Sequence, residues 1–196
     1  MKHIVFFLGV ILVSNIAAGQ YADGGAWTNV EIKKKVYNLD ISLREEFRLD
    51  ENFTHLASFF TQTALSYRFN KHFEIGGAYR FAQKNDFSPG FEFRHRYNID
   101  AAYKYKEKPF VFKIRTRYQA AYKNLYKEES RYNPEKTWRN KAALKFDLDK
   151  DYEPGIAYEI FYQINPEARG INAHRFTAGI DYKINKKSEV QLGYLF

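Results

Sequence analysis

The stretch from Phe91 to Tyr122 constrains the fold more than any other part of the chain. Alternate residues are apolar or aromatic from Phe91 to Tyr105 and again from Phe110 to Tyr122, and most residues between them are charged or polar. Because side chains of an extended strand alternate between its two faces, this pattern predicts a hairpin with one apolar and one charged face. Each strand exceeds the usual length of about five or six residues and fits the roughly 9–11 tilted residues that cross a bilayer.

The same alternation recurs along the rest of the chain. We expect strands at 27–33, 36–49, 59–69, 73–81, 91–105, 110–122, 138–148, 156–164, 174–184 and 190–196. Tight turns, the first at Lys33–Lys35, alternate with the longer loops 84–90, 123–136 and 165–173. The predicted fold is all-β, an up-and-down antiparallel transmembrane barrel of about ten strands, or of twelve if the chain is incomplete.

The tight turns raise a question about strand count. Here the tight turns follow the odd-numbered strands. In bacterial barrels the tight turns and both termini lie on the periplasmic side, so the tight turns follow the even-numbered strands. The predicted strands are therefore out of phase by one. Either the first hairpin is misassigned or a last strand after Phe196 is missing. A terminal Phe on an alternating strand is typical of the assembly signal of outer-membrane barrels and argues mildly against truncation.

Two segments are distinguished at the level of domains. Residues 1–19 combine Lys2 and His3, the apolar run 4–13 and small residues up to Gly19, which predicts a secretory signal peptide cut before Gln20. A membrane anchor is the alternative, but the run is shorter than the roughly 20 residues that a spanning helix needs. Residues 20–196 form the predicted barrel.

The composition excludes several classes of protein. The chain has no cysteine, so disulfides and thiolate metal sites are impossible. Its formal net charge of +8 could indicate binding to nucleic acid. Because the basic residues are spread through the strands and form no single patch, we expect no nucleic-acid partner. The mean hydropathy of −0.58 resembles that of a soluble protein, and a membrane barrel gives the same value because its polar and apolar faces cancel.

Alternation alone fits two barrels: a lipocalin-like barrel with the apolar face inside, or an outer-membrane barrel with that face toward lipid. Strand length and number favour the second. So does the polar face, because Arg mixed with Asp and Glu suits a lumen in which guanidinium groups pair with carboxylates. The predicted lumen charge ladder consists of Arg44, Glu46, Arg48, Arg80, Glu92, Arg94, Arg96, Asp100, Lys113, Arg115, Arg117, Arg139, Lys141, Glu159, Arg175 and Asp181.

Aromatic residues also favour the membrane barrel, because they gather near both ends of the strands as in the girdles of membrane interfaces. One predicted girdle flanks the tight turns and contains Tyr67, Phe69, Phe73, Tyr103, Tyr105, Phe110, Phe146, Tyr152 and Tyr182. The other lies toward the long loops and contains Tyr79, Phe81, Phe91, Phe93, Tyr118, Tyr122, Trp138 and Tyr162.

Several segments of the mature chain resemble a family of unknown function whose members are outer-membrane β-barrel proteins of Gram-negative bacteria. The resemblance covers Trp27 to Phe196. It rests on Trp27, Arg44-Glu45-Glu46-Phe47-Arg48, Tyr79-Arg80-Phe81, Arg94-His95-Arg96-Tyr97, Lys113-Ile114-Arg115-Thr116-Arg117-Tyr118-Gln119, Arg139-Asn140-Lys141 and Leu192-Gly193-Tyr194. It implies an outer-membrane barrel and no particular activity.

Few residues suggest chemistry. His95 and His174 lie on the apolar phase, where a lipid-modifying enzyme would carry its catalytic His, but neither has a Ser in a matching signature. No metal-ligand spacing occurs, and Glu128, Glu129 and Glu135 are expected to be solvated loop acids rather than a calcium site. We expect no enzyme, metal or cofactor.

The remaining candidate is the charge ladder. We expect it to fill the narrow lumen as a plug of paired charges, because buried charges are tolerated when paired. A narrow anion or small-solute channel is the alternative, and a lipid-modifying enzyme the second. The expected protein resides in the outer membrane and exposes its long loops. Its expected partners are outer-membrane lipid and the barrel-assembly machinery, with its oligomeric state left open.

Overall fold

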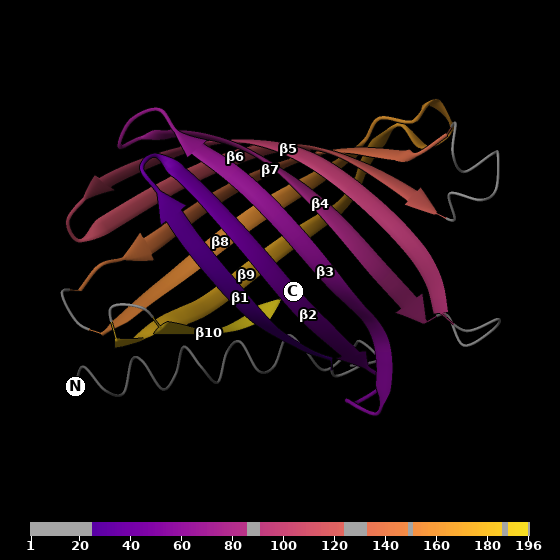
Figure 1. The fold of residues 1–196 in the computed structure, drawn as a ribbon, viewed down its shortest axis with the longest axis horizontal. Helices are drawn as coiled ribbons and strands as arrows, with labels where there is room; N and C mark the ends of the chain where they lie inside the picture. The colour runs from indigo at the N-terminus through magenta and orange to yellow at the C-terminus, as the bar shows by residue number, and fades with distance from the viewer. Residues whose placement is uncertain (1–24, 86–90, 124–132, 149–150, 186–187, 196) are drawn as a thin grey trace, which may run out of the picture.

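The computed structural model describes residues 25–85, 91–123, 133–148, 151–185 and 188–195. Its strands form one sheet, in chain order from β1 to β10 (Figure 1). They are β1 (Ala26–Val36), β2 (Leu39–Asp50), β3 (His55–Arg68), β4 (Phe73–Asn85), β5 (Phe91–Glu107), β6 (Phe110–Lys123), β7 (Glu135–Phe146), β8 (Tyr152–Gln163), β9 (Gly170–Asn185) and β10 (Ser188–Leu195). A short 3-10 helix, η1 (Pro166–Ala168), precedes β9. The predicted all-β, up-and-down antiparallel fold with ten strands is confirmed.

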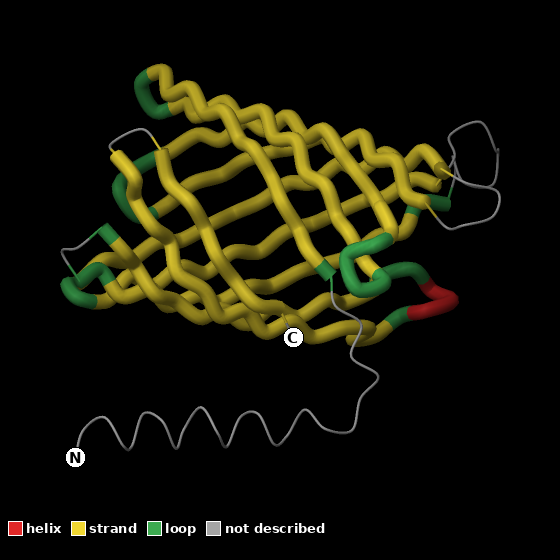
Figure 2. The backbone as a smooth tube through the Cα atoms, turned by 90° about the horizontal axis from the view of Figure 1, so that it is seen from below, coloured by secondary structure: helices red, strands yellow, loops and turns green. Residues whose placement is uncertain are grey.

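Each strand pairs antiparallel with the next, and the sheet curls round on itself (Figure 2). We call the inner side of this curl the lumen face. Within the described ranges, β1 and β10 are not paired with one another. The predicted hairpin of β5 and β6 is in register from Glu107↔Phe110 to Arg94↔Lys123. The predicted turn at 70–72 is fixed by Asn70, whose side-chain oxygen accepts hydrogen bonds from the backbone N–H groups of His72 and Phe73, both at 2.8 Å.

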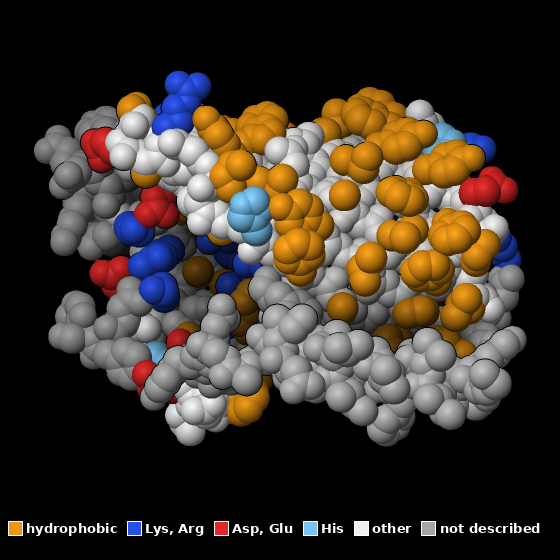
Figure 3. All heavy atoms as spheres, turned by 180° about the vertical axis from the view of Figure 1, so that it is seen from behind, with side chains coloured by type: hydrophobic (Ala, Val, Ile, Leu, Met, Phe, Trp, Pro, Cys, Tyr) orange, Lys and Arg blue, Asp and Glu red, His pale blue; other side chains and the backbone are white. Residues whose placement is uncertain are grey.

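The two faces of the sheet differ sharply. Large hydrophobic side chains cover the outward face, whereas basic and acidic side chains lie inside the opening at the long-loop end (Figure 3). In the described ranges, the buried hydrophobic residues are only Phe60, Ala102 and Val111, and the buried polar group includes Glu46, Asn98, Arg139 and Glu159. The interior is therefore charged, which is the reverse of a lipocalin-like barrel.

Aromatic contacts follow the outward face near both ends of the strands. Near the tight turns Tyr67, Phe69 and Phe73 form a chain of contacts with centroids 5.0 and 5.7 Å apart. Toward the long loops Phe81 stacks on Phe93 at 5.6 Å, and Tyr118 contacts Trp138 at 5.9 Å. These contacts lie in the two predicted girdles.

The first turn was predicted wrongly. It lies at Tyr37 and Asn38, with Tyr37 at φ 53°, and β1 continues through Lys33–Lys35 to Val36, which pairs with Leu39. The run of lysines indicated a turn, but their side chains alternate along a regular strand. In β2, the charged Glu45 lies on the outward face and accepts a hydrogen bond from Thr61 Oγ1 at 2.9 Å.

Two predicted loops are also shorter than expected, because β7 begins at Glu135 and β9 at Gly170. The predicted loop 84–90 and the rest of loop 123–136 lie partly outside the described residues, and the predicted signal peptide 1–19 lies wholly outside them. No helix in the described part of the chain is long and apolar enough to span a membrane.

Candidate functional site: the charged lumen

The lumen face is formed by alternate residues of each strand, and several of its carboxylates pair with basic side chains of the predicted ladder. Arg44 pairs with Glu31 at 2.8 Å, and Arg48 pairs with Glu46 at 2.8 Å. Asp100 accepts two parallel hydrogen bonds from Arg117, both at 2.6 Å. Arg94 lies 3.4 Å from Glu92, and Asp181 pairs with Lys145, which the ladder did not include.

Glu159 is the centre of the largest group of ion pairs. Its carboxylate lies 2.9 Å from Arg139, 2.7 Å from Arg115 and 3.9 Å from Arg175. The Glu159 residue is 3% exposed. One buried carboxylate from β8 therefore serves guanidinium groups of β6, β7 and β9. Arg139 is fixed further by a hydrogen bond to Gln119 Oε1 at 3.1 Å.

Three aromatic residues on the lumen face link the guanidinium groups. Each of Trp27, Phe60 and Phe161 carries two guanidinium groups over its ring. The distances to the ring centroids are 4.1 and 5.5 Å at Trp27 (Arg48, Arg175), 5.3 and 3.5 Å at Phe60 (Arg48, Arg80), and 4.4 and 5.0 Å at Phe161 (Arg139, Arg175). We call the resulting series Arg80–Phe60–Arg48–Trp27–Arg175–Phe161–Arg139 the guanidinium chain.

The guanidinium chain also connects the two ends of the sheet. β10 pairs with β9 as far as Leu195↔Thr177. Arg175 lies two residues further along β9, and its guanidinium reaches the Trp27 ring of β1. Cation–π contacts of this kind contribute about 0.5–2 kcal/mol each, more when they are shielded from water. Side-chain stacking therefore joins strands that share no backbone ladder among the described residues.

Some lumen cations have no carboxylate partner. Among the described residues, no acid lies within ion-pair distance of Arg80, Arg96, Lys113 or Lys141 of the predicted ladder, nor of Lys104. Several of these residues face another cation directly across neighbouring strands: Arg80↔Arg96, Lys104↔Lys113 and Arg115↔Lys141. Like charges directly opposite one another in a sheet are destabilising. The lumen face thus carries positive charge that its own acids do not neutralise.

A cavity of about 570 Å³ occupies the tight-turn half of the lumen. On β2 to β5 its wall combines small residues with charged or polar ones: Ser42, Ala64, Ser66, Gly76, Ala78 and Ala102 alternate with residues such as Asp40, Arg44, Gln62, Arg68, Glu74 and Asp100. Lys113, Arg115 and Arg117 line it from β6. The small residues leave open space between the long charged side chains that line the same cavity.

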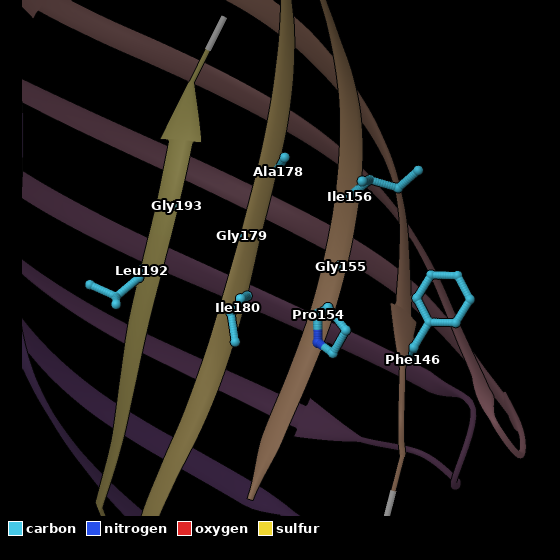
Figure 4. Close-up of a pocket in the computed structure, with 9 residues that line it drawn as sticks. All are labelled: Phe146, Pro154, Gly155, Ile156, Ala178, Gly179, Ile180, Leu192 and Gly193. Carbon is cyan, nitrogen blue, oxygen red and sulfur yellow. The ribbon is translucent and has the colours of Figure 1, made fainter. Parts of the chain in front are cut away.

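A second hollow of about 540 Å³ lies on the outward face, across β7 to β10 (Figure 4). It is lined by Phe146, Pro154, Gly155, Ile156, Ala178, Gly179, Ile180, Leu192 and Gly193. Its three glycines form one register row, Gly155↔Gly179↔Gly193. None of these side chains carries a polar group, so this hollow offers no chemistry.

Several lumen residues were missed by the sequence analysis as site residues. Glu31, Gln62, Phe60, Phe161 and Trp27 all contact ladder arginines. Their position in the alternating phase of their own strands was the signal that could have identified them.

The other candidate chemical residues lie elsewhere. His95 and His174 are on the outward face, where each ring stacks on a tyrosine whose hydroxyl is hydrogen-bonded to Nδ1: Tyr79 at 2.7 Å and Tyr158 at 2.6 Å. Glu135 begins β7 and pairs with Lys123 at 2.5 Å, and Glu128 and Glu129 lie outside the described residues. The described ranges contain no group of three acidic, His or Cys residues that could hold a metal ion.

Comparison with known proteins identifies a family. A family model described as "Protein of unknown function (DUF2490)" matches residues 24–196. The chain belongs to this family. A comparison of this chain with curated proteins found no match.

A solved structure supports the fold of this DUF2490 protein. A structure entitled "KdgM porin in complex with disordered oligogalacturonate" is 17% identical with a TM-score of 0.53, over 89% of this chain and 86% of the porin chain. A second KdgM porin structure is 18% identical with a TM-score of 0.48, over 88% and 89% of the two chains. At this identity the similarity concerns the fold alone.

Proposed function

We propose that the protein is an outer-membrane β-barrel that passes small anions through its lumen. The outward face supports the membrane location, since residues such as Ile99, Ile114 and Leu192 are more than half exposed and lie between two aromatic girdles. Without lipid this surface would be a large apolar patch exposed to water.

We propose anions as the solutes because the lumen contains positive charge that is not neutralised. The lumen-facing pairs Arg80↔Arg96 and Lys104↔Lys113 have no carboxylate within ion-pair distance among the described residues. The lumen acids of the predicted ladder are already engaged by other cations. A mobile anion would therefore find favourable sites near both ends of β5, whereas a mobile cation would not.

The similar porin supports the same class of solute. Its structure was solved with an oligogalacturonate, which is an acidic oligosaccharide. The cavity at the tight-turn end supports passage, because it shows that the side chains of this ten-stranded sheet do not fill the lumen there.

A closed structural barrel is the second candidate function. Glu159 joins guanidinium groups of β6, β7 and β9, and the guanidinium chain links side chains from β4 round to β7. These contacts favour a layer of packed side chains inside the barrel. In this case the protein would act as an envelope component through its long loops, without conducting solutes.

The membrane location can be tested by fractionation and electrophoresis. The protein is expected in the outer-membrane fraction, to migrate faster in gels before boiling than after, and to require detergent for dispersion. A product that remains dispersed in buffer without detergent would contradict the membrane location.

Planar-bilayer recording distinguishes the two functions. In a KCl gradient, the proposed channel should give a steady conductance with a reversal potential on the anion-selective side. Replacing Lys104 and Lys113 with Gln should lower that selectivity. The matched control is K34Q/K71Q, which removes two charges from exposed positions outside the lumen and should leave selectivity unchanged. Absence of steady conductance would instead support the closed barrel.

A further inference from the structure

Arg80 and Arg96 form a feature that a general excess of charge does not explain. The two residues are direct register partners of β4 and β5. Directly opposite residues of an antiparallel pair have Cβ atoms about 4.5–5.5 Å apart. Both guanidinium groups therefore share the same part of the lumen.

Arg80 is held in place by neutral neighbours. Its Nε and Nη2 both donate to Gln62 Oε1, at 3.0 and 2.7 Å. Its guanidinium lies 3.5 Å from the centroid of the Phe60 ring, and Phe60 is 2% exposed. Arg48 lies over the same ring at 5.3 Å. A buried ring and one amide thus orient a full positive charge without neutralising it.

Arg96 has donors to spare. Among the described residues no acceptor is within hydrogen-bond distance of its guanidinium, and its Nε is buried without a partner. The nearby acids are occupied: Glu46 binds Arg48, and both oxygens of Asp100 bind Arg117. The Arg80 Nη1 and the whole Arg96 guanidinium therefore remain able to donate.

We infer that Arg80 and Arg96 form a binding site for an oxyanion, a carboxylate or phosphate group of the solute. The inference rests on the proposed passage of anions and specifies which anions the lumen selects. Two planar guanidinium groups present several N–H donors in fixed directions, which match the two or more oxygens of a carboxylate or phosphate. A chloride ion is a single centre and cannot use that arrangement. Gln62 and Phe60 are positioning residues, because they act by orienting Arg80.

Equilibrium binding to the folded, detergent-solubilised protein tests the site. Titration calorimetry with sodium succinate and with inorganic phosphate, in a constant chloride background, should give saturable binding. Arg96→Met should weaken it at least tenfold, and Gln62→Leu several-fold. Arg169→Met removes an exposed arginine outside the lumen and should change nothing. Binding of both probes supports the shared oxyanion chemistry, and binding of one identifies carboxylate or phosphate as its source.

A second variant separates charge from shape. Arg96→Lys keeps the charge but loses the planar group, so oxyanion binding should fall by nearly as much as in Arg96→Met. If Arg96→Met does not fold, as judged by the absence of faster gel migration before boiling, Arg96→Lys replaces it as the test of the site. Full binding in Arg96→Lys, or no saturable binding in the native protein, would overturn the inference.

Failure of this site and failure of the proposed function give different results. If the site is wrong but the channel exists, anion-selective conductance persists and succinate and chloride permeate according to size alone. If the channel is wrong but the site exists, the bilayers show no conductance while calorimetry still shows binding that Arg96→Met weakens.

Discussion

Replacing Glu159 with Gln provides the sharpest test of how the lumen is held together. Glu159 is 3% exposed, and its oxygens are the acceptors for Arg139 and Arg115 and lie 3.9 Å from Arg175. Glutamine has nearly the same shape and keeps one acceptor oxygen. The substitution therefore removes the negative charge while leaving the surrounding packing in place.

The expected loss of stability follows from what remains behind. Removing one member of a buried ion pair costs about 3–5 kcal/mol, because the other charges stay buried without compensation. Since the Gln oxygen still accepts one hydrogen bond, we expect a loss near the lower end, about 3 kcal/mol. Glu153→Gln is the matched control: its partner Lys183 has a side chain that is 44% exposed, so the loss should be about 0–1 kcal/mol.

Urea unfolding in lipid vesicles, followed by tryptophan fluorescence, measures both variants. Trp27 is a suitable probe because it lies against Arg48 and Arg175. In bilayers the folded Glu159→Gln protein should also become more anion-selective, because it gains one uncompensated positive charge. Equal losses in the two variants, or a loss below about 1 kcal/mol for Glu159→Gln, would refute the role assigned to Glu159.

Substitutions at three further sites, Phe60, Gly179 and Tyr79, test separate parts of the structure. Phe60→Ala removes the buried ring between Arg48 and Arg80 and should cost about 3–5 kcal/mol in the same urea assay, whereas Phe60→Leu should cost less. Gly179→Ala would bring a Cβ within 2.6 Å of the Leu192 carbonyl oxygen and should cost about 1–3 kcal/mol, while Gly77→Ala, 3.7 Å from its nearest atom, should be neutral or slightly stabilising. Equal effects would exclude close strand packing as the cause. Tyr79→Phe removes the hydrogen bond to His95 and should cost about 0.5–1.5 kcal/mol, and a larger loss would indicate a further role for the hydroxyl.

The alternation of apolar and polar residues predicted the fold because each strand has an apolar outward face and a polar face toward the lumen. The period of two in β5 and β6 fixes which side chains share a face, and the paired register follows from the turn that joins them. The same rule identified the arginines and acids of the lumen. It failed at Lys33–Lys35, where composition indicated a turn and the strand simply continued to the turn at Tyr37 and Asn38.

The pairing of charges could not be predicted in the same way. Which acid meets Arg139 depends on the register of β7 and β8 and on the curl of the sheet, and neither is encoded within a single strand. The contact between Arg175 and Trp27 is still less accessible, since it joins residues that are far apart in the chain. Most importantly, counting ladder residues does not reveal that Arg80 and Arg96 are left without an acid.

The guanidinium chain limits which solutes could bind to the aromatic rings of the lumen. Binding sites for small molecules are usually lined by hydrophobic and aromatic side chains with few polar groups, so an uncharged sugar would need aromatic faces that are free. Each of Trp27, Phe60 and Phe161 already has two arginines over its ring. An uncharged sugar would have to displace a guanidinium group to stack on these rings. If the barrel passes solutes as proposed, we therefore expect it to select them by charge rather than by contact with a sugar ring.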